Sequence, residues 1–298
     1  LYIGCAGGLE TNATFHFKKE SLPSDITTYN LVVKGLKGGH SGLDIQLQRG
    51  NANKILNRIL WYVCEKLDIR IAGIEAGSLR NAIPREAKAR VVVPNSQYGE
   101  FRDYVNEVTE SVANELSRVD ADLKVELHQV SNPEFVIDKN TQDNLIRAIY
   151  GCPHGAIRMS DDMKDLVETS TNLAVIKSGD NAVFVQTLQR SSVDSAKEDL
   201  ANMIRSIFEL GGAEVLHEGA YPGWKPNPNS TILKIMKEVY NRKFGKVPEV
   251  KAIHAGLETG IISQAYPQLD MISFGPTISF PHSPGEKVNI ESVGKFWE

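Results

Sequence analysis

Apolar residues recur along the chain with two spacings, and these spacings predict alternating strands and helices. Runs with strand character cover residues 26–34, 69–76 and 87–94, and strict alternation covers 123–130. Helical spacing over residues 51–64 places Ile55, Leu56, Ile59, Leu60 and Val63 on one face. A second helix is indicated by Phe101, Val105, Val108, Val112 and Leu116. The order is β-α-β-β-α-β, which is typical of a compact two-layer lobe.

A similar but shorter pattern follows, and it predicts a second lobe. A helix is expected over residues 141–150, strands over 170–177 and 182–189, and a last strand over 213–217. The intervening helix would face inward with Leu200, Met203, Ile204, Ile207 and Phe208. Ser195 and Glu198 have the spacing of a capping box at its start, and Gly211 and Gly212 would end it. Two lobes side by side would make a double lid.

The richest Pro/Gly stretch covers residues 221–228, where the composition of the chain changes. Beyond it the pattern predicts an amphipathic helix over 230–242 and strands near Val250 and Met271. We therefore expect a domain boundary close to residue 221.

Composition narrows the functional classes. The chain has 298 residues, of which 41% are apolar and 23% charged, enough for about two domains with buried cores. A net charge of −4 without a lysine-rich run gives no basic field for nucleic acid. No apolar stretch approaches 18 residues and no charged-then-apolar leader is present, so we expect neither a membrane span nor a signal peptide within these residues, which leaves targeting open. Three scattered cysteines suit free thiols in a reducing cytoplasm.

Two glycine-flanked histidines follow strand-like runs and are candidates for chemistry. His282 and Glu286 lie four residues apart in a loop after the apolar run 271–274. A neutral imidazole there would suit a borderline-soft cation such as zinc, and a surface turn with an incidental histidine is the alternative. His40 lies in the glycine-rich segment 34–42, some 240 residues earlier.

Six separated motifs carry a resemblance to a known family. They are GGHSG at 38–42, LRNAIPREA at 79–87, VETSTN at 167–172, GAYPGW at 219–224, HAGLE at 254–258 and GPT followed by PHSP at 275–284. In this order they resemble the aminoacyl-histidine dipeptidases, also called Xaa-His dipeptidases, peptidase D or carnosinase-like peptidases. These belong to the dizinc metallopeptidase superfamily that includes peptidase V and peptidase T. The resemblance covers essentially the whole chain.

The resemblance implies an α/β fold in which a two-lobed β-α-β-β-α-β lid (an α+β lid) is inserted in a zinc-peptidase-like α/β catalytic domain. Residues 1–25 would be a remnant of the catalytic domain and 26–220 the lid and dimerisation domain, with lobes at about 26–130 and 165–220. Residues 221–298 would be the C-terminal part of the catalytic domain. The family's N-terminal acidic metal motifs do not occur here, so the chain resembles a C-terminal fragment that is expected to be inactive alone.

The resemblance also implies roles for single residues. His282 would bind one of two zinc ions, for which cobalt or manganese could substitute, and Glu286 would orient His282 or be a solvated turn carboxylate. His40 would stabilise the oxyanion of the transition state, from its own subunit or across a dimer. The alternative for His40 is a cap on the helix that starts near Asn51.

Further residues would bind the substrate. Arg190 matches the arginine that clamps the substrate carboxylate. Asn81 and Asn172 stand at equivalent points of the two lobes, and only one of them need contact substrate. Gly256 and Glu258 lie where relatives turn a backbone amide towards the carboxylate, whereas His254 is expected to be a packing residue.

These roles imply metal-dependent hydrolysis of dipeptides, with a preference for Xaa-His substrates, by a water activated by two zinc ions. A homodimer through the lid and a cytoplasmic location are implied as well, although a double lid would also suit a monomeric active site. A deacylase, desuccinylase or tripeptidase of the same superfamily is one alternative. A non-catalytic peptide-binding or dimerisation module is another, and retention of His40, Arg190 and His282 together disfavours it.

Overall fold

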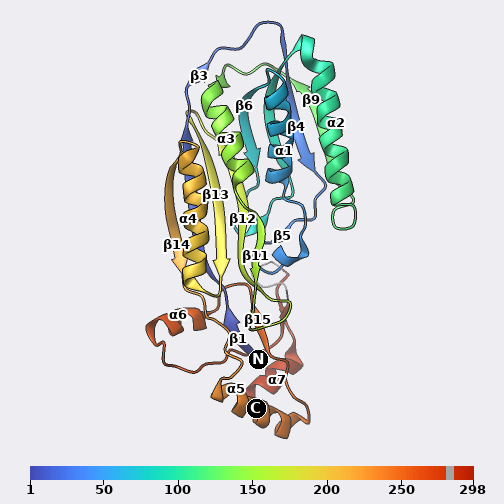
Figure 1. Cartoon of the computed structure of the whole chain (residues 1–298). Helices are drawn as coiled ribbons and strands as arrows, with labels where there is room; N and C mark the ends of the chain where they lie inside the picture. Colours follow the sequence, from blue (N-terminus) through green and yellow to red (C-terminus); the bar gives the residue numbers. More distant parts are fainter. Residues whose placement is uncertain (280–284) are drawn as a thin grey trace.

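A long body formed by one large sheet and its helices stands on a smaller C-terminal part (Figure 1). The structure is a computed structural model that describes residues 1–279 and 285–298. The smaller part contains β1 (Tyr2–Cys5), β15 (Lys251–Ile253), α5 (Thr231–Phe244), α6 (Glu258–Ala265) and α7 (Ile290–Trp297). β1 pairs in parallel with β15, so the start of the chain is tied to its C-terminal segment.

The large sheet has nine strands, and it runs through both predicted lobes without a break. The order is β14-β2-β13-β12-β6-β8-β4-β9, and β11 pairs with β12 beside this path. The strands are β2 (Gly7–His16), β4 (Ile26–Lys34), β6 (Arg70–Ala76), β8 (Ala87–Pro94), β9 (Lys124–Val130), β11 (Gly155–Met159), β12 (Val167–Ser178), β13 (Ala182–Ser191) and β14 (Glu214–Tyr221). Short pairs are formed by β3 (Lys19–Glu20) with β10 (Val136–Ile137), and by β16 (Ile278–Ser279) with β17 (Lys287–Val288).

The first lobe has the predicted order β4-α1-β6-β8-α2-β9, with α1 at Ala52–Lys66 and α2 at Tyr98–Glu115. The apolar face predicted for α1 is buried, and Asn51 caps this helix by accepting hydrogen bonds from the backbone N–H groups of Asn53 and Lys54. The alternative role of His40 as the cap of this helix is therefore wrong.

The second lobe repeats this topology, but its first strand comes from the N-terminal segment. Its order is β2-α3-β12-β13-α4-β14, with α3 at Lys139–Gly151 and α4 at Asp194–Leu210. In both lobes the strands lie side by side as last, first, third and second. This differs from the expectation that residues 1–25 belong with the catalytic domain, because β2 pairs with β13 and β14. Ala13 and Phe15 of β2 are buried in the core of this lobe.

Two details predicted for α4 are wrong. The residue before its first turn is Val193, which makes no side-chain cap, and Ser195 lies inside the helix, so the capping box does not form. Met203 is 49% exposed, because Leu200, Ile204 and Phe208 already fill the buried stripe at intervals of four residues. The lobe's core is completed by an edge-to-face contact between Phe208 and Phe15 of β2.

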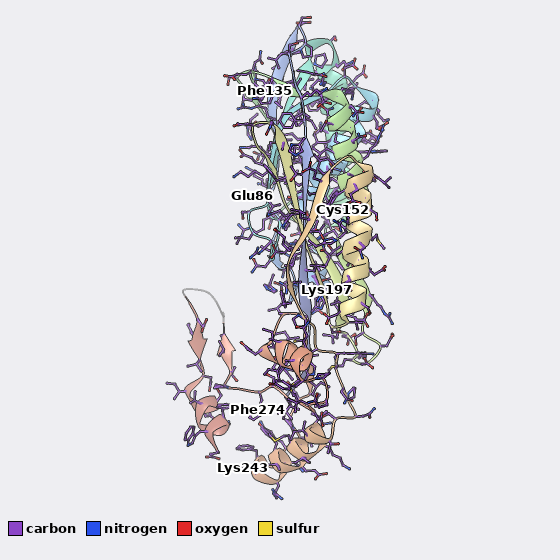
Figure 2. The ribbon with its side chains drawn as sticks, turned by 90° about the vertical axis from the view of Figure 1, so that its left-hand side faces the viewer. Glu86, Phe135, Cys152, Lys197, Lys243 and Phe274 are labelled. Carbon is purple, nitrogen blue, oxygen red and sulfur yellow. The ribbon has the colours of Figure 1, made fainter. Side chains whose placement is uncertain are left out.

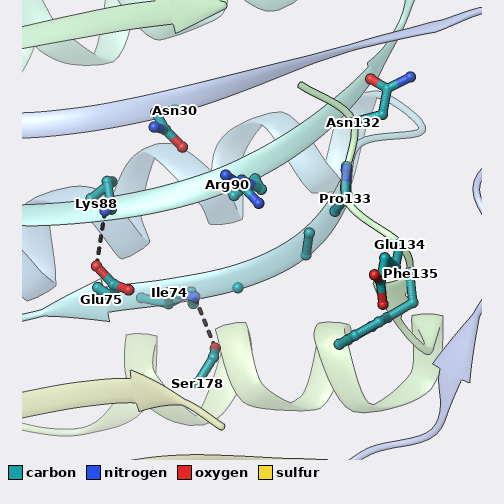
Figure 3. Close-up of a pocket in the computed structure, with 12 residues that line it drawn as sticks. Asn30, Ile74, Glu75, Lys88, Arg90, Asn132, Pro133, Glu134, Phe135 and Ser178 are labelled. Atoms are coloured by element: carbon teal, nitrogen blue, oxygen red, sulfur yellow. Dashed lines mark hydrogen bonds and ion pairs between the residues drawn. The ribbon is translucent and has the colours of Figure 1, made fainter. Parts of the chain in front are cut away.

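Helices α1 to α4 cover one face of the sheet, as the side view shows (Figure 2). The lobes meet where β6 pairs with β12, through Ala76 opposite Ile176 and Glu75 opposite Lys177. The opposite face carries a hollow of about 480 Å³ near this junction (Figure 3). There Lys88 and Glu75 form an ion pair of 2.8 Å, and the backbone N–H of Ile74 donates to the Ser178 hydroxyl at 2.8 Å. Among the described residues, no helix is long and apolar enough to cross a membrane.

Candidate functional site

A row of four residues crosses the end of the sheet that borders the C-terminal part. Ser170 of β12 pairs with Arg190 of β13, Arg190 pairs with Gly8 of β2, and Gly8 pairs with Tyr221 of β14. Side chains alternate along a strand, so Arg190 points away from the face on which Val183 and Val185 of the same strand pack in the core. The row therefore lies on the face opposite helices α1 to α4.

Arg190 is buried, with 5% of its surface exposed, and its nearest partners are hydroxyl groups. Its Nη1 donates to the Tyr221 hydroxyl at 2.8 Å, and its Nε donates to the Ser41 hydroxyl at 3.4 Å. Within the described part of the chain no carboxylate forms an ion pair with this guanidinium. A buried cation is costly unless an anion accompanies it, so the arrangement is suited to receive a carboxylate.

His40 lies beside the row on a short strand, β5 (Gly39–His40), which pairs with β7 (Ala82–Ile83). Its Nδ1 accepts from the backbone N–H groups of Gly42 at 3.1 Å and Leu43 at 3.0 Å. A nitrogen that accepts cannot carry the proton, so the neutral ring has its proton on Nε2. The neighbouring Ser41 bonds to Arg190, which brings the predicted His40 and Arg190 into one site.

The two asparagines have different environments. Asn172 is fully buried, and its Nδ2 donates to the carbonyls of Arg80 at 3.1 Å and Ala82 at 2.8 Å. Asn81 is exposed, and its backbone carbonyl accepts from the N–H of Ser41 at 2.8 Å. Asn172 therefore holds the segment that carries β7, whereas the side chain of Asn81 is available to a ligand.

His254 joins the C-terminal part to the sheet. It is buried, and its Nε2 shares a hydrogen bond of 2.7 Å with the Ser170 hydroxyl. Burial, with smaller effects from Arg190 and His40, lowers the pKa of His254 to about 3, so the ring is neutral at physiological pH. A Cβ at Gly42 would overlap the His254 carbonyl oxygen, and glycine there lets the two loops touch.

Four predicted residues remain: Gly256, Glu258, His282 and Glu286. Gly256 borders the Tyr221 ring, because a Cβ added to it would lie 3.1 Å from Tyr221 Cε2. Glu258 is exposed at the first turn of α6, and Glu286 is exposed before β17. His282 lies outside the described residues. Across residues 1–279 and 285–298, no group of three or more His, Cys, Asp or Glu side chains is placed to hold a metal ion.

Sequence reasoning missed three residues of the site: Ser41, Ser170 and Tyr221. The signals for them were weak but present. Ser170 belongs to a polar run, residues 168–172, which overlaps the start of the strand predicted over 170–177, and all five residues of the run are buried. Tyr221 directly precedes a Pro-Gly turn, and its position over β2 depends on a glycine more than two hundred residues away in sequence.

The chain is similar to known peptidases in sequence and in structure. Residues 31–120 match the family described as a peptidase dimerisation domain. The chain is 43% identical over 297 residues to the cytosol non-specific dipeptidase of Escherichia coli (strain K12), covering 100% of this chain and 61% of that protein. A crystal structure of aminoacylhistidine dipeptidase from Vibrio alginolyticus superposes with a TM-score of 0.94 at 43% identity, over 99% of this chain and 60% of that one.

This chain thus spans about three fifths of the length of the two relatives. The mixed α/β fold with its lid is confirmed by the structural match and by the dimerisation-domain match. The resemblance to the aminoacyl-histidine dipeptidases, predicted from six motifs, is confirmed along the whole chain.

Proposed function

We propose that this protein takes part in the metal-dependent hydrolysis of dipeptides, with a preference for Xaa-His substrates, and that the described site binds the substrate's free carboxylate. The observation that carries the proposal is the buried Arg190, whose partners are two hydroxyls and which lies beside the His40 loop. The similarity to two dipeptidases supports it.

Each group has a specific task in this proposal. Arg190 binds the carboxylate of the substrate through its planar array of N–H groups. The Nε2–H of His40 donates to the oxygen of the scissile carbonyl, on which negative charge develops in the transition state. Asn81 is the asparagine that contacts substrate, because its side chain is exposed, whereas Asn172 is fully buried and its Nδ2 is bonded to two backbone carbonyls.

The metal belongs to the proposal as well. Two zinc ions, with cobalt or manganese as substitutes, would lower the pKa of a bound water. His282 would be one ligand, and the described residues do not themselves form a metal centre. Gly256 and Glu258 would border the carboxylate end of the substrate, and Glu286 would orient His282.

The assembly and location are proposed on the same basis. A homodimer through the lid is supported by the match to a dimerisation domain, and His40 would then act in its own subunit or in the partner's site. A cytoplasmic location is supported by the name of the similar E. coli protein, a cytosol dipeptidase.

The test is hydrolysis of carnosine, Gly-His and Gly-Gly by the naturally occurring protein in which these residues are found. Activity is measured with zinc, with a chelator and after zinc is restored. We expect chelator-sensitive cleavage that favours histidine at the second position and falls by about a hundredfold or more in Arg190→Met. Cleavage of N-acyl amino acids without cleavage of dipeptides would replace the proposal with a deacylase, and catalysis that persists in excess chelator would contradict metal dependence.

A further inference from the structure

We propose that Tyr221 is a specificity-determining residue of this site: its hydroxyl donates to the carboxylate held by Arg190 and makes the site prefer a carboxylate over a neutral amide. The proposal deepens the proposed function, because it concerns the same carboxylate. It rests on the position of Tyr221 across the sheet and on the bonding of its hydroxyl.

Tyr221 reaches Arg190 across an intervening strand. The two residues belong to β14 and β13, and both pair with Gly8 of β2, which lies between them. Neighbouring strands are about 4.8 Å apart, so a side chain must cross β2 to span from one to the other. A Cβ at Gly8 would lie 2.6 Å from the Tyr221 hydroxyl oxygen and even closer to the ring. The absence of a Cβ at position 8 therefore leaves the space that the Tyr221 side chain occupies.

Hydrogen bonds also fix the backbone at and beside Tyr221. The Nζ of Lys197, a side chain that is 5% exposed, donates to the Tyr221 carbonyl at 2.8 Å and to Asp194 Oδ1 at 2.6 Å. Asp194 also accepts from the backbone N–H of Gly223 at 3.0 Å. Figure 2 shows Lys197 near the lower end of the long body, where the chain turns into the C-terminal part. On the far side of the ring, Gly256 leaves room for its edge.

The direction of the Arg190 bond determines what the hydroxyl can do. Guanidinium nitrogens only donate, so the Tyr221 oxygen accepts from Nη1 and its own proton must point elsewhere. Within the described residues, that proton has no acceptor to which it is bonded. A bond from a cation also polarises the hydroxyl and strengthens it as a donor.

The donors of this site are therefore matched to an anion. Nη1 and Nε of Arg190 are occupied by Tyr221 and Ser41, which leaves other guanidinium N–H groups and the Tyr221 O–H for a ligand. A carboxylate offers two oxygens that only accept, and each can take one of these donors. A terminal carboxamide would turn an NH₂ group towards one of them, so the amide loses a hydrogen bond and leaves a buried donor unmet.

The experiment measures binding to the natural protein kept in excess chelator, so that no dipeptide is cleaved during the titration. Gly-His and Gly-His amide are titrated calorimetrically at about pH 7.5 into the wild-type protein, Tyr221→Phe and Gly8→Ala. The matched control is Tyr150→Phe, because Tyr150 is an exposed tyrosine on α3, outside the site. Wild type should bind the acid at least about tenfold more tightly than the amide, and Tyr221→Phe should lose about tenfold for the acid and less than about twofold for the amide.

Gly8→Ala keeps the Tyr221 hydroxyl, but its Cβ would occupy the space of the Tyr221 ring, so this variant should also lose its preference for the acid over the amide. Tyr150→Phe should bind both ligands as the wild type does. Phenylalanine retains the ring between Gly8 and Gly256, and an unchanged melting temperature in Tyr221→Phe would verify that the fold is kept. Equal losses for acid and amide in Tyr221→Phe would reduce Tyr221 to a packing residue and overturn the proposal. A wild-type protein without acid preference, or without measurable binding, would overturn it too.

The outcome is separable from that of the proposed function. If the natural protein cleaves no dipeptide but binds with a Tyr221-dependent preference for the acid, the hydrolase proposal fails and the role of Tyr221 stands. If dipeptides are cleaved and the ratio of kcat/KM for acid and amide substrates is unchanged in Tyr221→Phe, the role of Tyr221 fails alone.

Discussion

Ser170 and His254 share a hydrogen bond of 2.7 Å in the buried seam between the sheet and the C-terminal part, although 84 residues separate them in sequence. His254 is neutral there, and the carbonyl oxygen of the same residue lies against Gly42. One histidine thus holds together the end of β12 and the loop that follows His40.

Ser170→Ala should lower the free energy of unfolding by about 1–3 kcal/mol, because the buried Nε2 of His254 loses its partner. Chemical denaturation measures the change. The control is Ser206→Ala on the exposed side of α4, where the hydroxyl bonds only to the Asn202 carbonyl of its own helix, and a change within about 0.5 kcal/mol is expected. Equal changes in the two variants would show that the Ser170 bond contributes little.

Stability should fall in mildly acidic solution because two histidines, the buried His254 and the half-buried His154, resist protonation. Burial lowers the pKa of His154 to about 4 and that of His254 to about 3, from an ordinary value of 6.5. Between those values the unfolded chain binds more protons than the folded chain, so stability is complete above about pH 6.5 and declines as the pH drops. Each histidine contributes a slope of up to about 1.4 kcal/mol per pH unit.

Denaturation at about pH 7.5 and about pH 5 measures this slope. His154→Gln should flatten it, because the variant removes a proton site that is empty in the folded state at these pH values. A slope that is the same in wild type and in His154→Gln would contradict the assignment.

Gly42→Ala should destabilise the site, because the new Cβ would overlap the His254 carbonyl, which is backbone and cannot move aside cheaply. We expect a loss of about 1–3 kcal/mol together with weaker dipeptide binding. Gly99→Ala is the opposite case: it lies inside α2 with open space around its Cβ position. It should stabilise the chain by about 0.5–1 kcal/mol, measured by the same denaturation.

Replacing Asn172 should mainly lower stability, whereas replacing Asn81 should mainly weaken ligand binding. Asn172→Asp puts oxygens where two backbone carbonyls need donors, and we expect a loss of about 3 kcal/mol or more. Asn81→Ala should leave stability within about 0.5 kcal/mol and weaken dipeptide binding several-fold, as titration would measure. A stable Asn172→Asp variant would mean that its two bonds do not hold β7.

The first lobe could be predicted from sequence because its information is local. The buried stripe of α1 is a property of a single segment and is present in the structure. In β9 the alternate residues Val125 and Leu127 pack against the core, although burial does not alternate along the whole strand. The start of α4 was predicted less well, because Ser195 has the right type and spacing for a cap but packing of Leu200 and Ile204 sets the helix register.

The site could be predicted only in part. His40 and Asn172 lie in two of the six motifs, and Arg190 was predicted from the family resemblance. The contact between Arg190 and Tyr221 depends on the pairing of both with Gly8, which no local pattern reveals. β2 has few apolar residues, so its own sequence only weakly favours a strand or a particular neighbour. Which strands it pairs with therefore depends on the packing of the whole sheet.

The position of β2 between β13 and β14 also sets an order of assembly. All strands of the first lobe fall within residues 26–130, so that lobe can form early from nearby contacts. β2 precedes it in the chain, yet 178 residues separate Thr11 from its bonding partner Gln189. During synthesis from the N-terminus, β2 has to remain unpaired until β13 and β14 have emerged. Its glycines and threonines bury little apolar surface, and a weakly hydrophobic strand can wait in solution with less risk of pairing with another chain.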